Sequence, residues 1–311
     1  MEKTKILVTG GAGFIGSAIV CELAKDKNNL LVIVDNLLTG DTKRIPQQEN
    51  IRFINANVND FADISSIFYS FSFDYVFHYA AVVGVKRTLE NPIMVLDDLK
   101  GLRNVLDLCR KTEVKRIFFS SSSEVYGEPV ELPQNEHTTP LNSRLPYAIV
   151  KNVGEAFLKS YKQEYDLDYT IFRFFNTYGP LQSKDFVISK FVKAALKNED
   201  ITIFGDGSQT RTFCYIDDNI HACVNALKNN EIMNDVVNIG SDVVYTVLEL
   251  AQKIIKISGS TSKIVHLPPL EEGDMTRRQP DTKIMQELLG REPIDLEAGL
   301  KKVIDNPSFF S

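Results

Sequence analysis

Residues 9–16 have the sequence Thr-Gly-Gly-Ala-Gly-Phe-Ile-Gly, and they join a short apolar run to a helix-like apolar pattern. Gly10 permits a tight turn, Gly13 lets the backbone approach a bound phosphate group, and Gly16 lets a helix pack closely on the preceding strand. The helix N-terminus would bring its amides and its positive dipole to the turn. The stretch therefore predicts a strand, a tight turn and a helix at the start of the chain.

Apolar runs of strand length recur beyond this turn. They are separated by helical patterns and occupy residues 5–9, 30–34, 51–55, 75–79, 117–120 and 169–174. Strands that are apolar throughout and alternate with amphipathic helices are typical of a parallel sheet covered on both faces. We therefore expect an α/β fold of the Rossmann type, with a doubly wound and mostly parallel sheet.

The regular alternation of apolar strands with helical patterns ends after residue 175. A helical pattern, a short strand and a loop rich in Gly, Ser, Gln and Thr follow, and an apolar run at 236–239 has strand character again. We expect residues 1–175 to form the first domain, with 213–245 returning to it. Residues 176–212 and 246–311 are expected to form a smaller C-terminal α/β domain that binds the substrate.

The composition excludes several classes of protein. The chain has 311 residues, with 35 Lys and Arg against 41 Asp and Glu, and therefore a formal charge of −6. It contains no basic tract, so we expect no binding to nucleic acid or to an anionic membrane, since both need a clustered positive field. The apolar runs are far shorter than the roughly 20 residues that span a bilayer.

The cysteines and histidines predict neither disulfides nor a metal site. Cys21, Cys109, Cys214 and Cys223 form no Cys-x-x-Cys pair, and the four histidines lack the spacing of zinc ligands. We interpret the cysteines as reduced core residues. No secretory signal precedes the first strand, so we expect a cytoplasmic protein.

An acid at the end of the second strand points to a dinucleotide cofactor. Asp35 follows Gly16 by 19 residues, where a carboxylate accepts hydrogen bonds from an adenosine ribose and repels the extra phosphate of NADP. NAD is therefore the expected cofactor; the alternative is that the glycines only shape a turn and Asp35 only ends a strand. The loops after the next two strands would contact the cofactor or be ordinary strand ends. The expected cofactor-binding residues are Gly10, Gly13, Phe14, Ile15, Gly16, Asp35, Asn36, Asn57, Val58, Ala80, Ala81 and Val82.

Tyr147 and Lys151 are the expected chemical pair. Their i,i+4 spacing in a long helical pattern puts both side chains on one face of the helix. A phenol has a pKa near 10, and a neighbouring ammonium favours the phenolate and lowers that pKa, so Tyr147 can act as a general base. The alternative is a solvated helix face.

The strand before this helix ends in hydroxyl groups. Residues 120–124 are Ser-Ser-Ser-Ser-Glu, and side chains at the carboxyl end of a parallel strand lie at the edge where α/β sheets bind ligands. We expect Ser122 to share a substrate hydroxyl with Tyr147, and Glu124 to handle a second proton. A serine-rich turn is the alternative. The expected catalytic residues are Tyr147, Lys151, Ser122, Ser123 and Glu124.

Together these motifs resemble the extended short-chain dehydrogenase/reductase family, the NAD-dependent nucleotide-sugar epimerases and dehydratases, whose common setting is the synthesis of polysaccharide precursors. The likeness covers nearly the whole chain and includes the sequences at 121–127, 173–180 and 205–211. The resemblance implies tightly held NAD, a C-terminal domain for a nucleoside-diphosphate sugar, and oxidation at sugar C4. It also implies that Tyr147 is the base, Ser122 its hydroxyl partner, and Lys151 a ligand of the nicotinamide ribose.

The same resemblance implies contacts with substrate and with a second copy of the chain. A diphosphate suits the donor geometry of guanidinium groups. The family usually forms a homodimer through two long helices, which correspond here to residues 100–109 and 147–161. The expected substrate contacts are Asn176, Arg211 and one of Arg277 and Arg278 at the diphosphate, and Ile203 and Phe204 near the nucleobase.

Several net reactions start from oxidation at C4. The 4-keto sugar can be reduced on its other face, lose water, lose carbon dioxide or be released, which gives a 4-epimerase, a 4,6-dehydratase, a decarboxylase or a 4-dehydrogenase. The Ser123-Glu124 pair resembles GDP-mannose 4,6-dehydratases and UDP-glucuronate decarboxylases, whereas dTDP-glucose dehydratases carry Asp-Glu. Glu124 favours a route that uses chemistry at C5, and the net product stays open.

Two positions depart from the family pattern. Asp98 stands where an asparagine is usual, and Asn57 stands where an aspartate usually faces the adenine. Asn57 keeps a carbonyl acceptor, so we expect NAD binding to persist, and we expect Asp98 to alter how the active-site backbone is held. The alternative from another class of protein is a non-catalytic NAD-binding sensor or scaffold on the same fold.

Overall fold

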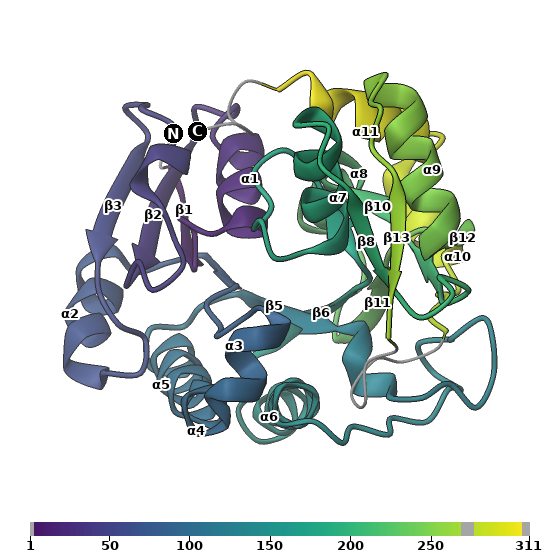
Figure 1. The fold of residues 1–311 in the computed structure, drawn as a ribbon. Coiled ribbons are helices and arrows are strands. Elements are labelled where there is room, and N and C mark those ends of the chain that lie inside the picture. Colours follow the sequence, from purple (N-terminus) through teal and green to yellow (C-terminus); the bar gives the residue numbers. More distant parts are fainter. Residues whose placement is uncertain (1–2, 269–276, 307–311) are drawn as a thin grey trace. The chain divides into compact units, whose positions relative to one another are not determined.

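The computed structural model describes residues 3–268 and 277–306 (Figure 1). The chain forms two compact units. The first comprises Met1–Val125, Leu141–Arg173 and Ile220–Val237, and the second comprises Tyr126–Pro140, Phe174–Asn219 and Asn238–Ser311. The chain therefore passes between the two units repeatedly.

The first unit is built on a seven-stranded sheet with the strand order β11-β6-β5-β4-β1-β2-β3. β1 pairs in parallel with β2 and β4, β2 with β3, and β4 with β5. Most residues of β1, β2 and β5 are buried, as the continuous apolar runs predicted, and the Rossmann-type α/β fold is confirmed. The strands are β1 (Thr4–Thr9), β2 (Asn29–Asp35), β3 (Ile51–Asn55), β4 (Tyr75–His78), β5 (Arg116–Ser122), β6 (Asp168–Phe174) and β11 (Asp235–Ile239).

Helices cover both faces of this sheet, and Figure 1 shows α5 and α6 on one side of it and α1 on the other. Buried side chains of α2, α5 and α6, such as Phe68, Leu106 and Leu158, share one core with Val32 and Ile117 of the sheet. Because β1 to β5 pair in parallel, their carboxyl ends lie at one edge. The helices are α1 (Phe14–Leu23), α2 (Phe61–Phe71), α3 (Val85–Glu90), α4 (Pro92–Leu96), α5 (Asp98–Lys111), α6 (Pro146–Tyr165) and α8 (Ile216–Lys228).

The second unit combines short strand pairs with helices. The parallel pairs are β7 (Thr177–Tyr178) with β10 (Cys214–Tyr215) and β8 (Ile201–Phe204) with β13 (Ile264–Leu267), and the antiparallel pair is β9 (Thr210–Thr212) with β12 (Val244–Thr246). Its helices are α7 (Val187–Leu196), α9 (Val247–Ser258), α10 (Lys283–Leu289) and α11 (Leu296–Ile304). A capping box of Thr246 and Glu249 begins α9, and Gly259 in a left-handed conformation ends it.

The cysteines are free thiols, and Cys109, Cys214 and Cys223 are buried. Cys21 is exposed, so the prediction of a core residue was wrong at this position. α1 is apolar around most of its circumference, and its pattern therefore does not show which side faces the sheet. Within residues 3–268 and 277–306, no helix combines the length and the apolar character of a membrane span, and no three His, Cys, Asp or Glu side chains form a metal cluster.

Candidate active site

The turn between β1 and α1 is so closely packed that two of its positions accommodate only glycine. Gly10 has a φ of +70°, and a Cβ atom there would lie 2.6 Å from the backbone nitrogen of Ala80. A Cβ atom on Gly16 would lie 2.2 Å from the carbonyl oxygen of Gly10. The absence of these side chains lets the first turn of α1 lie against the ends of β1 and β4.

The N-terminus of α1 suits an anion. In the described chain no side chain caps the helix at Gly13, and the first turn contains no acidic residue. The amides of this turn and the helix dipole are therefore available to a pyrophosphate. The residues of the turn thus fit the phosphate groups of NAD.

Asp35 ends β2 with its carboxylate held in one orientation. Its Oδ2 accepts a hydrogen bond from the backbone N–H of Ala12 (3.0 Å), and its Oδ1 accepts one from the N–H of Leu37 (2.8 Å). A Cβ atom on Gly40 would lie 2.8 Å from Oδ1, so the loop also packs against the carboxylate. A carboxylate has about four acceptor positions, and the other two suit ribose hydroxyls beside the glycine turn.

The remaining predicted cofactor residues lie at the start of α1 and in the loops after β2, β3 and β4. These strands run parallel beside β1, so the loops share one edge of the sheet with the glycine turn. Several are ordered by local bonds: Oδ1 of Asn57 accepts the N–H of Asn59 (3.1 Å), and the N–H of Ala80 donates to Oγ1 of Thr9 (3.3 Å). The structure brings to this edge Phe14, Ile15, Asn36, Asn57, Val58, Ala80, Ala81 and Val82.

Tyr147 and Lys151 lie one turn apart near the start of α6. Nζ of Lys151 is 5.7 Å from the centre of the Tyr147 ring and donates a hydrogen bond to the carbonyl oxygen of Ser120 (2.7 Å). Lys151 is buried, and this burial lowers its pKa to about 8, against the opposing effect of the Asp98 carboxylate. Below that pH the ammonium favours the phenolate form of Tyr147, because the two charges attract.

The end of β5 brings a hydroxyl group to the same edge of the sheet. β5 ends at Ser122, and a short 3-10 helix, Ser123–Tyr126, follows it. Oγ of Ser122 accepts the backbone N–H of Glu124 (3.2 Å), so its own O–H remains a donor for another group. The side chain of Ser123 is buried, whereas Glu124 is partly exposed.

Sequence analysis missed a buried ion pair next to this group. Glu155, one turn after Lys151 on α6, accepts hydrogen bonds from Nε (2.9 Å) and Nη2 (2.7 Å) of Arg173 on β6. Oγ of Ser121 donates to the same carboxylate at 2.6 Å, and both charged side chains are 2% exposed. The available signals were Glu155, an acid that lies four residues after Lys151 as Lys151 lies four after Tyr147, and Arg173, a charged residue near the end of the mostly apolar strand β6.

The substrate residues that the resemblance implied lie in the second unit. Asn176 has a φ of +26°, and its Nδ2 donates to the carbonyl oxygen of Thr212 (3.0 Å), so it lies beside the strand that carries Arg211. Arg211 is buried, and its Nη1 donates to the carbonyl oxygen of Thr210 (2.8 Å). A residue held at positive φ without being glycine is strained, which is a common property of binding sites.

The other residues of this set differ in exposure. On β8 the side chain of Ile203 is buried and that of Phe204 is exposed, because neighbouring residues of a strand point to opposite sides. Arg277 and Arg278 begin the second described segment, the first exposed and the second partly exposed.

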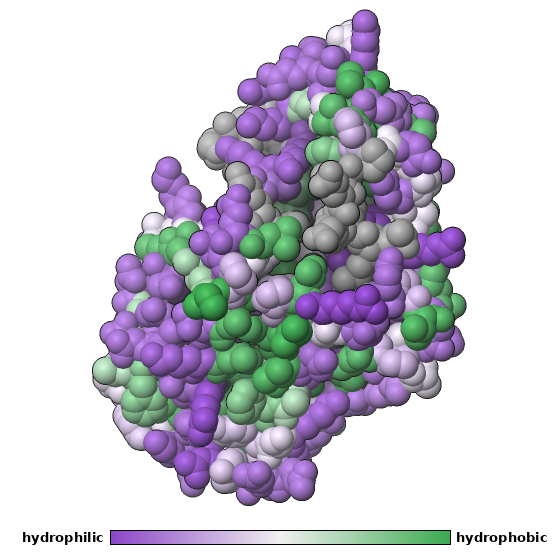
Figure 2. Space-filling model, turned by 60° about the horizontal axis from the view of Figure 1, so that its bottom comes forward, coloured by the Kyte–Doolittle hydropathy of each residue, from purple (hydrophilic) through white to green (hydrophobic). Residues whose placement is uncertain are grey.

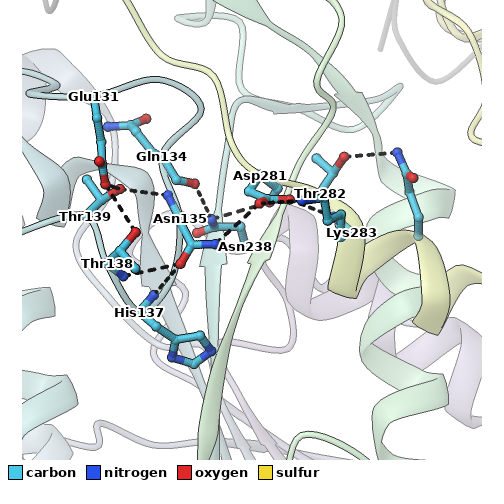
Figure 3. A network of polar contacts seen from close by, with 11 residues as sticks. Glu131, Gln134, Asn135, His137, Thr138, Thr139, Asn238, Asp281, Thr282 and Lys283 are labelled. Atoms are coloured by element: carbon cyan, nitrogen blue, oxygen red, sulfur yellow. Dashed lines mark hydrogen bonds and ion pairs between the residues drawn. The ribbon is translucent and has the colours of Figure 1, made fainter.

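A polar network within the second unit anchors the stretch that precedes Tyr147 (Figure 3). The N–H of Gln134 donates to the carbonyl oxygen of Gln279 (2.7 Å), and its carbonyl oxygen accepts the N–H of Asp281 (2.8 Å) and Nδ2 of Asn238 (2.9 Å). Nδ2 of Asn135 donates to the Asp281 carboxylate (3.3 Å). The network therefore fixes the loop 131–139 to the segment that follows Arg277 and Arg278.

Fold and site together define an NAD-binding oxidoreductase. A model of the NAD dependent epimerase/dehydratase family matches residues 6–240. The chain belongs to this family, as the resemblance implied.

Individual relatives cover almost the full chain. It is 39% identical to a putative UDP-glucose 4-epimerase of Methanocaldococcus jannaschii, over 96% of this chain and 97% of that protein. It is 36% identical to a UDP-N-acetyl-alpha-D-glucosaminuronate decarboxylase of Bacillus cytotoxicus, over 97% of both. The crystal structure of UDP-glucose 4-epimerase from Thermotoga maritima with UDP-glucose superposes with a TM-score of 0.91, at 34% identity over 97% of each chain. These findings confirm an NAD-dependent enzyme that abstracts hydride from C4 of a nucleoside-diphosphate sugar.

Proposed function

We propose that the sugar is carried by UDP and that Tyr147, Ser122 and Lys151 perform its oxidation. The observation that carries these roles is the placement of Lys151: its buried ammonium lies one turn from Tyr147 and is fixed by the Ser120 carbonyl at the end of β5. Uridine diphosphate is proposed because the similar proteins include UDP-glucose 4-epimerases and a UDP-sugar decarboxylase.

Each residue has one task in the oxidation. The phenolate of Tyr147 removes the proton from the C4 hydroxyl, and the O–H of Ser122 donates a hydrogen bond to that oxygen as it becomes a carbonyl. Lys151 stabilises the phenolate and binds the nicotinamide ribose. The cofactor, when bound, supplies the acceptor for the C4 hydride. In the reverse direction Tyr147 returns the proton.

The glycine turn and Asp35 are proposed to hold the other half of the cofactor. The amides at the start of α1 would bind the pyrophosphate, and the Asp35 carboxylate would accept hydrogen bonds from the adenosine ribose. In the second unit, Asn176, Arg211 and Arg277 would bind the diphosphate of the substrate, with Phe204 and Ile203 near the base. Guanidinium groups suit this anion because they offer paired donors.

The proposed net reaction continues at C5 and C6 of the 4-keto sugar. Glu124 is partly exposed two residues after Ser122, where a carboxyl group can exchange a second proton. A uronic acid would lose its C6 carboxylate as carbon dioxide, C5 would take up a proton, and the hydride would return to C4. A sugar with a C6 hydroxyl would instead lose the C5 proton and that hydroxyl as water, and the hydride would be delivered to C6.

A 4-epimerase is the second candidate, favoured by the identity to the Methanocaldococcus and Thermotoga proteins. In that case the hydride returns to the opposite face of C4, and Glu124 is only a hydrogen-bonding neighbour of the sugar. The substrate then needs no leaving group at C5 or C6.

Mass spectrometry of products distinguishes these reactions. The protein is incubated with NAD and UDP-glucose, UDP-N-acetylglucosamine or UDP-glucuronic acid, with GDP- and dTDP-sugars as comparison. Loss of carbon dioxide or water is the expected result, and Glu124→Gln should slow it strongly, while the same change at the exposed neighbour Glu128 should not. An unchanged mass with a new retention time identifies an epimerase. No reaction across the panel contradicts the proposed uridine diphosphate carrier and the proposed roles of Tyr147, Ser122 and Lys151.

We also propose a homodimer formed through the first unit. Exposed apolar side chains gather on α3, α4 and the start of α6, and Figure 2 shows a broad hydrophobic area on this face. They are Leu89, Ile93, Met94, Leu96 and Ile149. A contiguous apolar surface of this kind is typical of an interaction site. The free thiols suit a reducing compartment, and we propose the cytoplasm as the location, with a role in glycan precursor synthesis.

Replacing Ile93 by aspartate is expected to convert the dimer into a monomer, because a charge in the middle of an apolar interface has no partner there. Analytical ultracentrifugation measures the change. Val130 in the second unit is equally exposed, 71% for each side chain, and Val130→Asp is the matched control that should remain a dimer. An unaltered sedimentation coefficient for Ile93→Asp would place the interface elsewhere.

A further inference from the structure

A small cavity lies behind the loop that follows β4. Its volume is about 10 Å³, enough for roughly one water molecule. Its walls include Ala80 and Ala81 of that loop, Phe119 of β5, Asp98 of α5, Lys151 of α6 and His78 of β4. The partly buried carboxyl group of Asp98 and the buried ammonium of Lys151 therefore line one small cavity whose other walls are mostly apolar.

A hydrogen bond to the backbone of the β4 loop fixes the Asp98 carboxylate at this cavity. Asp98 is the first residue of α5, and its Oδ2 accepts the backbone N–H of Val82 (2.8 Å). Burial raises the pKa of the Asp98 carboxyl, whereas the Val82 N–H and the positive charge of Lys151 act in the opposite direction. The dipole of α5 also favours a negative charge at its first residue.

The groups that face Lys151 come from four elements of the described chain, namely β4, β5, α5 and α6. His78 on β4 is neutral over the working pH range, because burial and the nearby Lys151 lower its pKa to about 3, and its Nδ1 is bonded to Oγ1 of Thr9 (2.9 Å). β5 contributes only the Phe119 ring and a carbonyl oxygen. Tyr147 faces Lys151 from α6 itself. Asp98 is thus the acid opposite the ammonium, and its own neighbour Asp97 is exposed.

We propose that Asp98 is a positioning residue that acts through Lys151: its carboxylate is the counter-ion across the water-sized cavity and sets the pH range in which Tyr147 serves as the base. This inference rests on the proposed roles of Tyr147 and Lys151. An asparagine at this position would keep the bond to Val82 but carry no charge, so charge and backbone support can be separated by one substitution.

The direction of the effect follows from the charges. When Asp98 is ionised, its negative charge partly offsets the positive charge of Lys151, so the ammonium stabilises the Tyr147 phenolate less. In Asp98→Asn the ammonium is unopposed, which lowers the pKa of Tyr147. The ammonium itself also loses a stabilising charge, which lowers the pKa of Lys151 below its value of about 8. Both limbs of the pH profile should therefore move to lower pH, by roughly 1 unit.

Two measurements test the proposal. The first is the pH dependence of turnover in wild type and Asp98→Asn. The second is independent of turnover and follows the near-ultraviolet absorbance of the Tyr147 phenolate during a pH titration. The absorbance of the matching Tyr147→Phe variant is subtracted, so that only the signal of Tyr147 remains. The expected result is a lower midpoint in Asp98→Asn by both methods, whereas Asp97→Asn, which removes an exposed neighbouring charge, should leave both unchanged.

Unshifted midpoints in Asp98→Asn overturn the proposal and reduce Asp98 to a support of the Val82 backbone. If Asp98→Asn folds poorly, Asp98→Ser replaces it with the same expectations, since its hydroxyl is also an uncharged acceptor. The proposed function fails separately: full turnover in Tyr147→Phe would refute the role of the tyrosine. If Tyr147→Phe loses turnover and the midpoints of Asp98→Asn are unshifted, the role of Tyr147 stands and only the role of Asp98 as a counter-ion is refuted.

Discussion

Tyr147→Phe is expected to lower kcat by about 10²- to 10⁴-fold, the range that a positioned general base contributes. The phenylalanine ring occupies the same space but has no oxygen to take the proton of the C4 hydroxyl. Cofactor affinity should change little, because the proposed cofactor contacts lie in the glycine turn, at Asp35 and at Lys151. Turnover is measured with the substrate that the product analysis identifies, and the dissociation constant of NAD by calorimetry.

The matched control is Tyr165→Phe at the other end of α6. It also removes a phenolic hydroxyl from α6, but at an exposed position, so kcat should stay near the wild-type value. Equal activity of the two variants would show that the base lies elsewhere. A large loss of NAD affinity in Tyr147→Phe would show instead that the tyrosine acts mainly on the cofactor.

The fold could be predicted because local and global signals agree. The glycine spacing at 10, 13 and 16 requires close backbone packing, and the structure contains that packing at the contact of Gly16 with Gly10. Continuous apolar runs predicted the strands of the parallel sheet, and their ends differ from the structure by one or two residues. These differences arise where polar residues, such as Asn29 and Asp35 of β2, continue the ladder.

The chemical set was only partly predictable. Spacing predicts that Tyr147 and Lys151 share a helix face. The burial of Lys151, however, depends on its contact with Ser120 of β5, which lies 31 residues earlier in the sequence. For the same reason the contact of Asp98 with Val82 has no local signal. The short pairing of β9 with β12 joins residues over 30 positions apart through three residues each, too short for a recognisable pattern.

The buried pair Glu155–Arg173 shows most clearly what spacing alone leaves out. Acidic residues on long helices are ordinarily solvated, and Glu155 has a sequence context like any of them. Its burial results from Arg173 on β6 and Ser121 on β5, two strands that fold against α6. Since Lys151 lies one turn earlier on α6 and Ser122 follows Ser121, this pair also fixes the distance between the two halves of the chemical site.

Arg173→Met is therefore expected to destabilise the protein by about 3–5 kcal/mol, because it leaves the Glu155 carboxylate buried without its counter-ion. Urea unfolding measures the free energy of unfolding. The double variant Glu155→Leu/Arg173→Met should recover most of the loss, since an apolar pair of similar volume needs no compensation for desolvation.

Lys253→Met provides the comparison. It breaks a 3.0 Å ion pair with Glu297 whose side chains are partly exposed, and such pairs contribute at most about 1 kcal/mol. If Arg173→Met costs no more than Lys253→Met, the Glu155 carboxylate must reach water or another partner. In that case kcat should be as high in Arg173→Met as in the wild type. If the destabilisation is large, a fall in kcat of the folded variant is expected as well, because the end of β5 then loses its fixed position relative to Lys151.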